Sequence, residues 1–216
     1  MAILAVLSED ENGDPFLRRN VLAKIELRSN SDTLLHRANA MRPKILVDNQ
    51  ADRFVNFVYN GYLKSCNTKQ KQEFHFQNRE RDVAIIVYIL ATGLRVSEII
   101  NLNLNDINME TKQVTLTRKG GKQDTPSFSE WGKNYLQRYL DIRHKYNPPK
   151  DEPAVFLAKS PANQEGHRIS KRAVQTFVER YGIAFGVPNL TVHKLRHSFA
   201  TNFLRNNPGE LETLQA

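Results

Sequence analysis

The chain has 216 residues and is 40% hydrophobic, so it can bury a sizeable core but is short for two full domains. Lysine and arginine number 31 against 23 acidic residues, and the resulting formal net charge of +8 favours an anionic partner. The single cysteine, Cys66, excludes an internal disulfide and a thiolate zinc cluster, and favours a reducing cytoplasm. The longest apolar runs, at 1–7 and 83–91, are too short to span a bilayer, so we expect no membrane partner.

The first 44 residues carry too few apolar side chains to fold by themselves. Residues 1–7 have the pattern of a helix end, and the acidic, turn-forming sequence SEDENGDP follows at 8–15. A polar and basic stretch then continues to about Pro43. We therefore interpret residues 1–44 as the end of another domain with a linker, and residues 45–216 as the folded domain.

Beyond residue 45 the periodicity predicts an α+β fold that is mostly helical. Residues 113–119 alternate as a strand does, a glycine pair at 120–121 makes a turn, and residues 122–128 return, which predicts a hairpin. With a further strand at 154–158, the hairpin would form a small three-stranded antiparallel sheet. Helices are predicted from Asp48 to about Tyr62 and at 78–91, 96–101, 129–145, 170–185 and from about 191 onward.

The sequence ATGLRVSEIINL at 91–102 is the first stretch with possible chemistry. Gly93 ends one helix, Arg95 stands at the start of the next, and Glu98 follows one turn later. An arginine beside unpaired helix N–H groups can grip a phosphate or carboxylate, and Glu98 can orient its guanidinium. The same residues also fit a surface ion pair worth a few tenths of a kcal/mol, about the usual value for an exposed pair.

The predicted hairpin tip, TRKGGKQD at 117–124, carries Arg118, Lys119 and Lys122. A hairpin tip is slim enough to enter a DNA groove, and its cations can neutralise phosphate oxygens. Charged side chains at such a tip can also serve solubility alone, so the residues by themselves leave both interpretations open.

A second basic stretch, GHRISKRAVQTFVERY at 166–181, surrounds a predicted helix start. Ser170 is the expected N-cap, and Arg168, Lys171 and Arg172 flank it. Three cations at a helix N-terminus would make a phosphate clamp. A solvated basic face has the same composition.

The sequence HKLRH at 193–197 places His193, Arg196 and His197 along one edge of a helix whose other side is apolar. Lys194 stands where a zinc-binding helix of the HExxH type has its glutamate, so we expect no metal site here. A histidine can move a proton near neutral pH, and an arginine one turn away can hold charge on the same anionic group. Either histidine taken singly also fits a structural role.

The stretches ATGLRVSEIINLNLNDI, TRKGGK and HKLRHSFAT, in this order and at these separations, resemble the catalytic domain of the tyrosine recombinases, the phage-integrase and Xer family. Each motif alone is weak, but the ordered set is specific. The resemblance covers about residues 45–216. The sequences TRKGGK and HKLRH are most like those of the single Xer-type recombinases of Gram-positive bacteria. DPFLRRNV at 14–21 resembles the segment that joins the family's core-binding domain to its catalytic domain, so residues 1–44 would be the end of that domain and a linker.

The resemblance implies an enzyme that cleaves and rejoins DNA strands through a 3′-phosphotyrosyl intermediate. Arg95 and Arg196 would bind the non-bridging oxygens of the scissile phosphate, and Lys119 would protonate the departing 5′ oxygen. His193 would be a general acid and base, with Glu98 and His197 as supports. The residues expected to contact DNA are Arg118, Lys122, Arg168, Lys171 and Arg172.

The family chemistry also sets expectations for partners and cofactors. The partner would be double-stranded DNA with an inverted-repeat site, on which the full-length protein forms a homotetramer, while this chain would be a monomer. Neither a metal nor ATP is implied, because the arginines and lysine supply the positive charge and the phosphotyrosyl link conserves bond energy. This chemistry is common to chromosome-dimer resolution, phage integration and transposon movement.

One feature departs from the family pattern. The nucleophilic tyrosine would fall just past Ala216, and all seven tyrosines present precede His193. We therefore expect a C-terminally incomplete catalytic domain that binds DNA but does not cleave it alone. A non-catalytic, DNA-binding integrase remnant and a basic domain that binds RNA or another polyanion are the alternatives.

Overall fold

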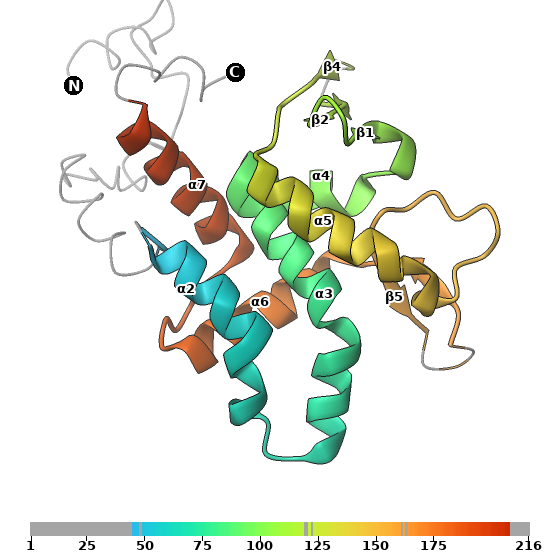
Figure 1. Ribbon diagram of the computed structural model, residues 1–216, viewed down its shortest axis with the longest axis vertical. Coiled ribbons are helices and arrows are strands. Elements are labelled where there is room, and N and C mark those ends of the chain that lie inside the picture. The colour runs from blue at the N-terminus through green and yellow to red at the C-terminus, as the bar shows by residue number, and fades with distance from the viewer. Residues whose placement is uncertain are drawn as a thin grey trace, which may run out of the picture. The chain divides into compact units, whose positions relative to one another are not determined.

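A computed structural model of the chain describes residues 45–47, 49–118, 121, 123–160, 162 and 164–207. The expectations for residues 1–44, Lys119 and Lys122 lie outside these residues. The central element is helix α3 (Lys69–Thr92), and α2 (Gln50–Asn56), α5 (Glu130–Ile142), α6 (Lys171–Phe185) and α7 (Val192–Asn206) pack against it (Figure 1). Every residue from 81 to 90 of α3 is buried, so the apolar run at 83–91 forms the core. Among the described residues, no helix is long and apolar enough to cross a membrane.

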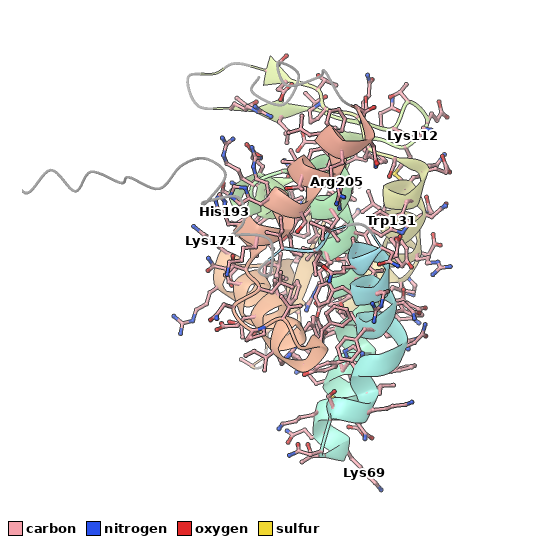
Figure 2. All side chains as sticks on the ribbon, turned by 90° about the vertical axis from the view of Figure 1, so that its left-hand side faces the viewer. Lys69, Lys112, Trp131, Lys171, His193 and Arg205 are labelled. Atoms are coloured by element: carbon pink, nitrogen blue, oxygen red, sulfur yellow. The ribbon has the colours of Figure 1, made fainter. Side chains whose placement is uncertain are left out.

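Helix α3 begins at Lys69, earlier than the predicted start at residue 78. Thr68 caps it, because its Oγ1 accepts the backbone N–H of Lys71 at 3.3 Å. The first turns are rich in lysine, glutamine and glutamate, which form helices readily but show no apolar periodicity. The prediction missed them because it relied on that periodicity. This half of α3 is largely exposed, and Figure 2 shows Lys69 at one tip of the molecule.

The other predicted helices are confirmed with small changes of boundary. The predicted 48–62 helix is α2, followed by a π-helical turn and a 3-10 turn, and the predicted 129–145 helix is α5 followed by a 3-10 turn. The remaining three are α4, α6 and α7: all start within a residue of the prediction, and the short α4 and α6 also end within a residue of it. The π-helical turn spans Phe57–Gly61, and α4 spans Val96–Asn101. The 3-10 turns span Tyr62–Ser65, Leu104–Asp106 and Arg143–Tyr146.

The predicted three-stranded sheet is wrong, although the α+β, mostly helical class is confirmed. The described residues form three antiparallel sheets of two strands each. The hairpin is present, with Leu116 opposite Asp124 and Thr117 opposite Gln123. The segment predicted as the third strand instead pairs with residues 166–168, because the chain reverses directly after it and returns along its edge. The pairs are β1 (Ile107–Asn108) with β2 (Gln113–Val114), β3 (Leu116–Thr117) with β4 (Gln123–Asp124), and β5 (Leu157–Lys159) with β6 (Gly166–Arg168).

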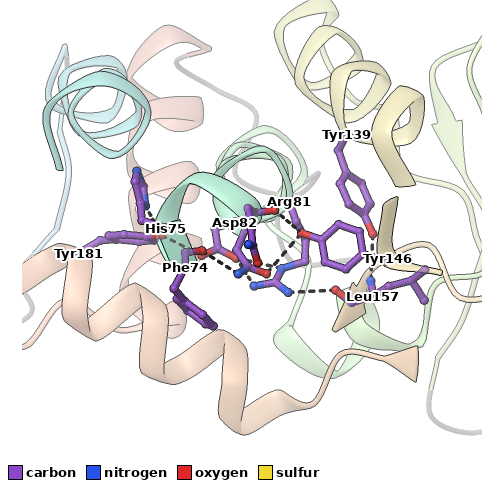
Figure 3. A network of polar contacts seen from close by, with 10 residues as sticks. Phe74, His75, Arg81, Asp82, Tyr139, Tyr146, Leu157 and Tyr181 are labelled. Carbon is purple, nitrogen blue, oxygen red and sulfur yellow. Dashed lines mark hydrogen bonds and ion pairs between the residues drawn. The ribbon is translucent and has the colours of Figure 1, made fainter. Parts of the chain in front are cut away.

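A buried ion pair connects α3 to its neighbours (Figure 3). Arg81 and Asp82 are 5% and 0% exposed, and Arg81 Nη2 lies 2.6 Å from Asp82 Oδ1. Arg81 Nη1 also donates to the carbonyl of Leu157 in β5 at 3.0 Å, and the Tyr181 hydroxyl of α6 donates to Asp82 Oδ2 at 2.8 Å. A buried charge is costly unless it is both paired and hydrogen-bonded, and here both charges are. The network therefore ties α3, α6 and β5 together.

His75 extends this network on the α6 side. The side chain is 1% exposed, and its Nδ1 lies 3.1 Å from the Tyr181 hydroxyl oxygen. Because that hydroxyl donates to Asp82, the contact requires the proton on His75 Nδ1. Burial lowers the pKa of His75 to about 4, although the nearby Asp82 charge acts in the opposite direction. His75 is therefore neutral in the folded chain near neutral pH.

Replacing His75 with phenylalanine should remove part of the acid sensitivity of folding. The pKa of about 4 lies below the ordinary 6.5, so the unfolded chain takes up the proton first. The free energy of unfolding is then unaffected above about pH 6.5 and falls by up to about 3 kcal/mol as the pH drops towards 4. Phenylalanine keeps the ring contacts with Tyr62 and Tyr181 but cannot titrate.

Urea denaturation of wild type and His75→Phe at about pH 7 and about pH 4.5 measures this difference. His144→Gln, which removes an exposed histidine, should keep the wild-type pH dependence. If wild type and His75→Phe lose the same free energy on acidification, the buried neutral histidine is not the cause.

Candidate functional site

The site begins at the turn between α3 and α4. Gly93 ends α3 with φ 65°, a left-handed conformation that glycine adopts without strain. Arg95 then precedes the first turn of α4 and is held by Glu98, whose Oε2 accepts the Arg95 backbone N–H at 2.7 Å. Glu98 Oε1 also pairs with Arg95 Nη1 at 3.0 Å. The Arg95 side chain is 56% exposed, so its guanidinium is oriented by the protein and open to a ligand.

Helix α7 docks on the same turn. The Phe199 ring occupies the space where a Cβ on Gly93 would stand, so the helix approaches the glycine as closely as the backbone allows. Arg196, one turn earlier in α7, donates from Nη1 to the Gly93 carbonyl. Thr191 caps α7 by accepting the Lys194 N–H at 3.3 Å. Two arginines distant in the sequence are thereby anchored on one turn.

A cavity of about 630 Å³ lies between the start of α4, α6 and the start of α7. Arg95, Lys171, His193 and Arg196 all line it. Figure 2 shows His193 and Lys171 on the same side of the molecule. The structure thus brings together four of the residues that the sequence singled out, from three different helices.

A second cavity of about 930 Å³ lies between α4 and the β3–β4 hairpin, and Arg95, Glu98 and Arg118 line it. Arg95 therefore stands between the two cavities. The pKa of Arg196 is lowered, first by burial and then by the charge of Arg95, with a smaller lowering by Arg118 and an opposing effect of Glu98. Three guanidinium groups lie within electrostatic reach of one another, an arrangement that an anion such as phosphate would stabilise.

The two histidines of α7 form a direct contact. His193 Nε2 lies 2.8 Å from His197 Nε2, with the rings nearly perpendicular at 85°. One nitrogen must carry the proton and the other must accept it, so the pair cannot hold a proton on both facing nitrogens. Burial lowers the pKa of His197, and the charges of His193 and Arg196 lower it further. The pair therefore shares a single proton between its two facing nitrogens.

Arg168 does not join the site. Its guanidinium donates to the carbonyls of Ile100 at 2.7 Å and Leu102 at 3.1 Å, and to Asn103 Oδ1 at 2.6 Å. The side chain therefore satisfies the C-terminal end of α4 from β6. The expected DNA contact by Arg168 stays a prediction, and Nη1 and Nη2 of its guanidinium already donate to groups of the protein.

The other basic residues that the sequence singled out lie near the start of α6 or in the β3–β4 hairpin. Ser170 caps α6 as predicted, accepting the Ala173 N–H at 3.2 Å. Arg172 is exposed on α6 but lines neither cavity. Lys119 and Lys122, at the hairpin tip, are not among the described residues.

Sequence reasoning missed several polar residues at the cavities. Gln175, Glu179 and Asn189 line the first cavity, and nothing in their local sequence distinguishes them from ordinary surface residues. Asp124 pairs with Arg118 across the hairpin, and the register of the predicted hairpin is the signal that would have found it. Among the described residues, no group of three or more His, Cys, Asp or Glu side chains could hold a metal ion.

The seven tyrosines lie away from both cavities, since none is among the described residues that line them. Tyr139 and Tyr181 are fully buried, and burial raises the pKa of both, that of Tyr139 to about 12. Their hydroxyls take part in the interior hydrogen bonds, as Tyr139 does by accepting the Leu157 N–H at 2.9 Å. The side chains of Tyr139 and Tyr181 therefore have a structural role in the core.

Gly93→Ala should destabilise the fold more than Gly186→Ala does. Both glycines have positive φ, 65° and 89°, so alanine costs about 1–2 kcal/mol of backbone strain at either position. Only at Gly93 would the new methyl group overlap Phe199, because nothing lies within 4 Å of a Cβ on Gly186. The overlap should add about 1–3 kcal/mol, measured as the difference in unfolding free energy between the two variants. Equal losses would show that Phe199 does not pack tightly against Gly93.

The chain matches the phage integrase family over residues 52–215. The tyrosine recombinase XerS of Lactococcus lactis subsp. cremoris (strain MG1363) is 37% identical over 194 residues, which are 89% of this chain and 53% of XerS. XerS of Streptococcus gordonii (strain Challis) is also 37% identical, with the same coverage of both chains. The chain therefore spans about half the length of these relatives.

Solved structures share the fold. A XerH site-specific recombinase bound to a palindromic difH substrate, in a post-cleavage complex, superposes with a TM-score of 0.61 at 21% identity, over 95% of this chain and 53% of XerH. The Tn1549 transposon integrase in complex with circular intermediate DNA has a TM-score of 0.57 at 21% identity, over 80% of this chain and 57% of the integrase. The chain belongs to the phage integrase family and has the fold of a tyrosine recombinase catalytic domain.

Proposed function

We propose that the protein acts in site-specific DNA recombination, cleaving and rejoining strands through a 3′-phosphotyrosyl intermediate. The observation that carries the proposal is the meeting of Arg95, His193 and Arg196 at one cavity, although they come from two helices far apart in the sequence. The XerH neighbour is bound to a palindromic substrate, which supports duplex DNA with an inverted-repeat site as the partner.

The geometry supports a role for each residue around a scissile phosphate. Arg95 and Arg196 hold the non-bridging oxygens, and their fixed positions favour the transition state, in which charge on those oxygens increases. Glu98 orients Arg95, and the Gly93 carbonyl orients Arg196. These contacts keep both guanidinium groups in place before DNA binds.

Proton transfer falls to His193, supported by His197, and to Lys119. The ring contact at 2.8 Å lets His197 orient the ring of His193, which then exchanges a proton with the attacking hydroxyl. Lys119, on the hairpin, protonates the departing 5′ oxygen. Lys171, Arg172, Lys122 and Arg118 contact the DNA backbone on either side, and a homotetramer forms on paired sites in the full-length protein.

The chain by itself binds DNA without cutting it, because none of its seven tyrosines lies at the cavity. The nucleophile of the proposed reaction is then none of these seven tyrosines. Incubation of the chain with a duplex nicked near the cleavage position tests this point. A stable covalent protein–DNA adduct would contradict it.

Arg196→Ala in the full-length protein should lower the rate of strand cleavage at least about a thousandfold, because a fixed donor to the reacting phosphate is lost. Folding should be largely kept, since the side chain is only partly buried. The substrate is the duplex that the wild-type chain selects from a random-sequence pool. Cleavage is followed as covalent adduct, and folding as the urea denaturation midpoint.

Lys145→Ala is the matched control, because it removes one exposed positive charge that lines neither cavity. Its cleavage rate should stay within about threefold of wild type, the size of effect expected from net charge alone. Unchanged turnover in Arg196→Ala contradicts the assignment. A wild-type protein that binds the selected duplex but never cleaves it favours a non-catalytic DNA-binding remnant.

A further inference from the structure

We propose that Arg118 is a third guanidinium at the phosphate held by Arg95 and Arg196, and that Asp124 is the residue that positions it. The inference deepens the proposed function and rests on it. It places Arg118 at the reacting phosphate itself, not at the DNA backbone beside it. It also gives Asp124 a role that the residues around it in the sequence do not indicate.

The hairpin register places the two side chains together. Leu116 lies opposite Asp124, so the two residues point to the same face of the β3–β4 ribbon. Arg118 follows Leu116 by two residues and shares that face, which makes Asp124 its diagonal neighbour across the strands. Diagonal neighbours are within reach of a long side chain such as arginine.

The contact itself is short and partly shielded. Arg118 Nη2 lies 2.6 Å from Asp124 Oδ2, and the two side chains are 24% and 34% exposed. A neighbouring ion pair, Lys112 with Glu130, has a distance of 3.4 Å and exposures of 40% and 61%. A short, charge-assisted hydrogen bond restricts the orientation of the planar guanidinium more than a long, exposed contact does.

Arg118 lines one of the two cavities of the site, and its side chain is only 24% exposed. It lines the cavity that Arg95 and Glu98 also line, so the hairpin forms the wall opposite α4. Its charge also reaches Arg196, whose pKa it lowers. The charges of Arg95 and Arg118 both act on Arg196, and a single anion among the three would relieve this repulsion.

Each of the three arginines is held by an acceptor group of the protein. Glu98 holds Arg95, the Gly93 carbonyl holds Arg196, and Asp124 holds Arg118, so each guanidinium is fixed by a different acceptor. A guanidinium carries five N–H donors, so one that is held by an acceptor on one side can still bind a phosphate. Asp124 thereby differs from a carboxylate that only reduces the positive charge of the surface.

The test compares the affinity of single and double variants of the chain for the duplex that the wild-type chain selects. Arg118→Ala should lower affinity about tenfold or more and reduce the slope of log K against log salt by about 0.9. Asp124→Asn adds a net positive charge, so a general field effect would tighten binding. Positioning predicts the opposite, a several-fold loss. In the Arg118→Ala background, Asp124→Asn should then have no further effect, because its partner is absent.

A charge swap separates positioning from hairpin stability. Arg118→Asp combined with Asp124→Arg keeps an ion pair across the ribbon, so the urea denaturation midpoint should stay near that of wild type. Affinity should remain as low as in Arg118→Ala, because the guanidinium now extends from the other strand. Glu130→Gln, which breaks the exposed pair with Lys112, is the control and should bind within about twofold of wild type.

Asp124→Asn binding as tightly as wild type, or the swap variant recovering wild-type affinity, overturns the inference while leaving the proposed function in place. A wild-type chain that selects no duplex overturns the proposed function and the inference with it. The wild-type measurement thus distinguishes the two failures.

Discussion

The candidate site depends on the close contact between α7 and the Gly93 turn. The turn needs a residue that tolerates positive φ, the Phe199 ring needs the space of a missing Cβ, and Arg196 needs the Gly93 carbonyl. Because these requirements meet at one residue, the position of α7 fixes both arginines relative to each other. The histidine pair is one turn of α7 from this contact, so its place follows from the same docking.

The core beneath the turn is organised around α3, which is surrounded by the other helices over its second half. Within that half, Arg81 and Asp82 replace apolar contacts by directed hydrogen bonds to β5 and α6. Apolar packing alone tolerates sliding of one helix along another, whereas these bonds have one favourable arrangement. The network therefore sets the register of the helices on which the cavity residues stand.

Features encoded by neighbouring residues could be predicted from the sequence directly. Among features made by distant residues, only the common site of Arg95, His193 and Arg196 was expected, through the family resemblance. The Gly93 stop, the spacing of Arg95 and Glu98, the hairpin and the Ser170 cap each depend on a few consecutive residues. The inward orientation of Arg168 depends on the end of α4, and the strand at 157–159 finds its partner only after the chain reverses. The buried pair at 81–82 was missed because adjacent charges in a sequence usually indicate surface.

Helix α4 has six residues, too few to be stable by itself, so it exists through contacts with the rest of the domain. Arg95 and Glu98 secure its beginning, Arg168 secures its end, and the Arg196 contact with Gly93 spans 103 positions of the sequence. Contacts of such long range close late, because the chain must first lose the entropy of large loops. The candidate site is therefore a product of the completed fold: no short segment of the described chain presents it, and a partly folded chain would carry the same cations without their common arrangement.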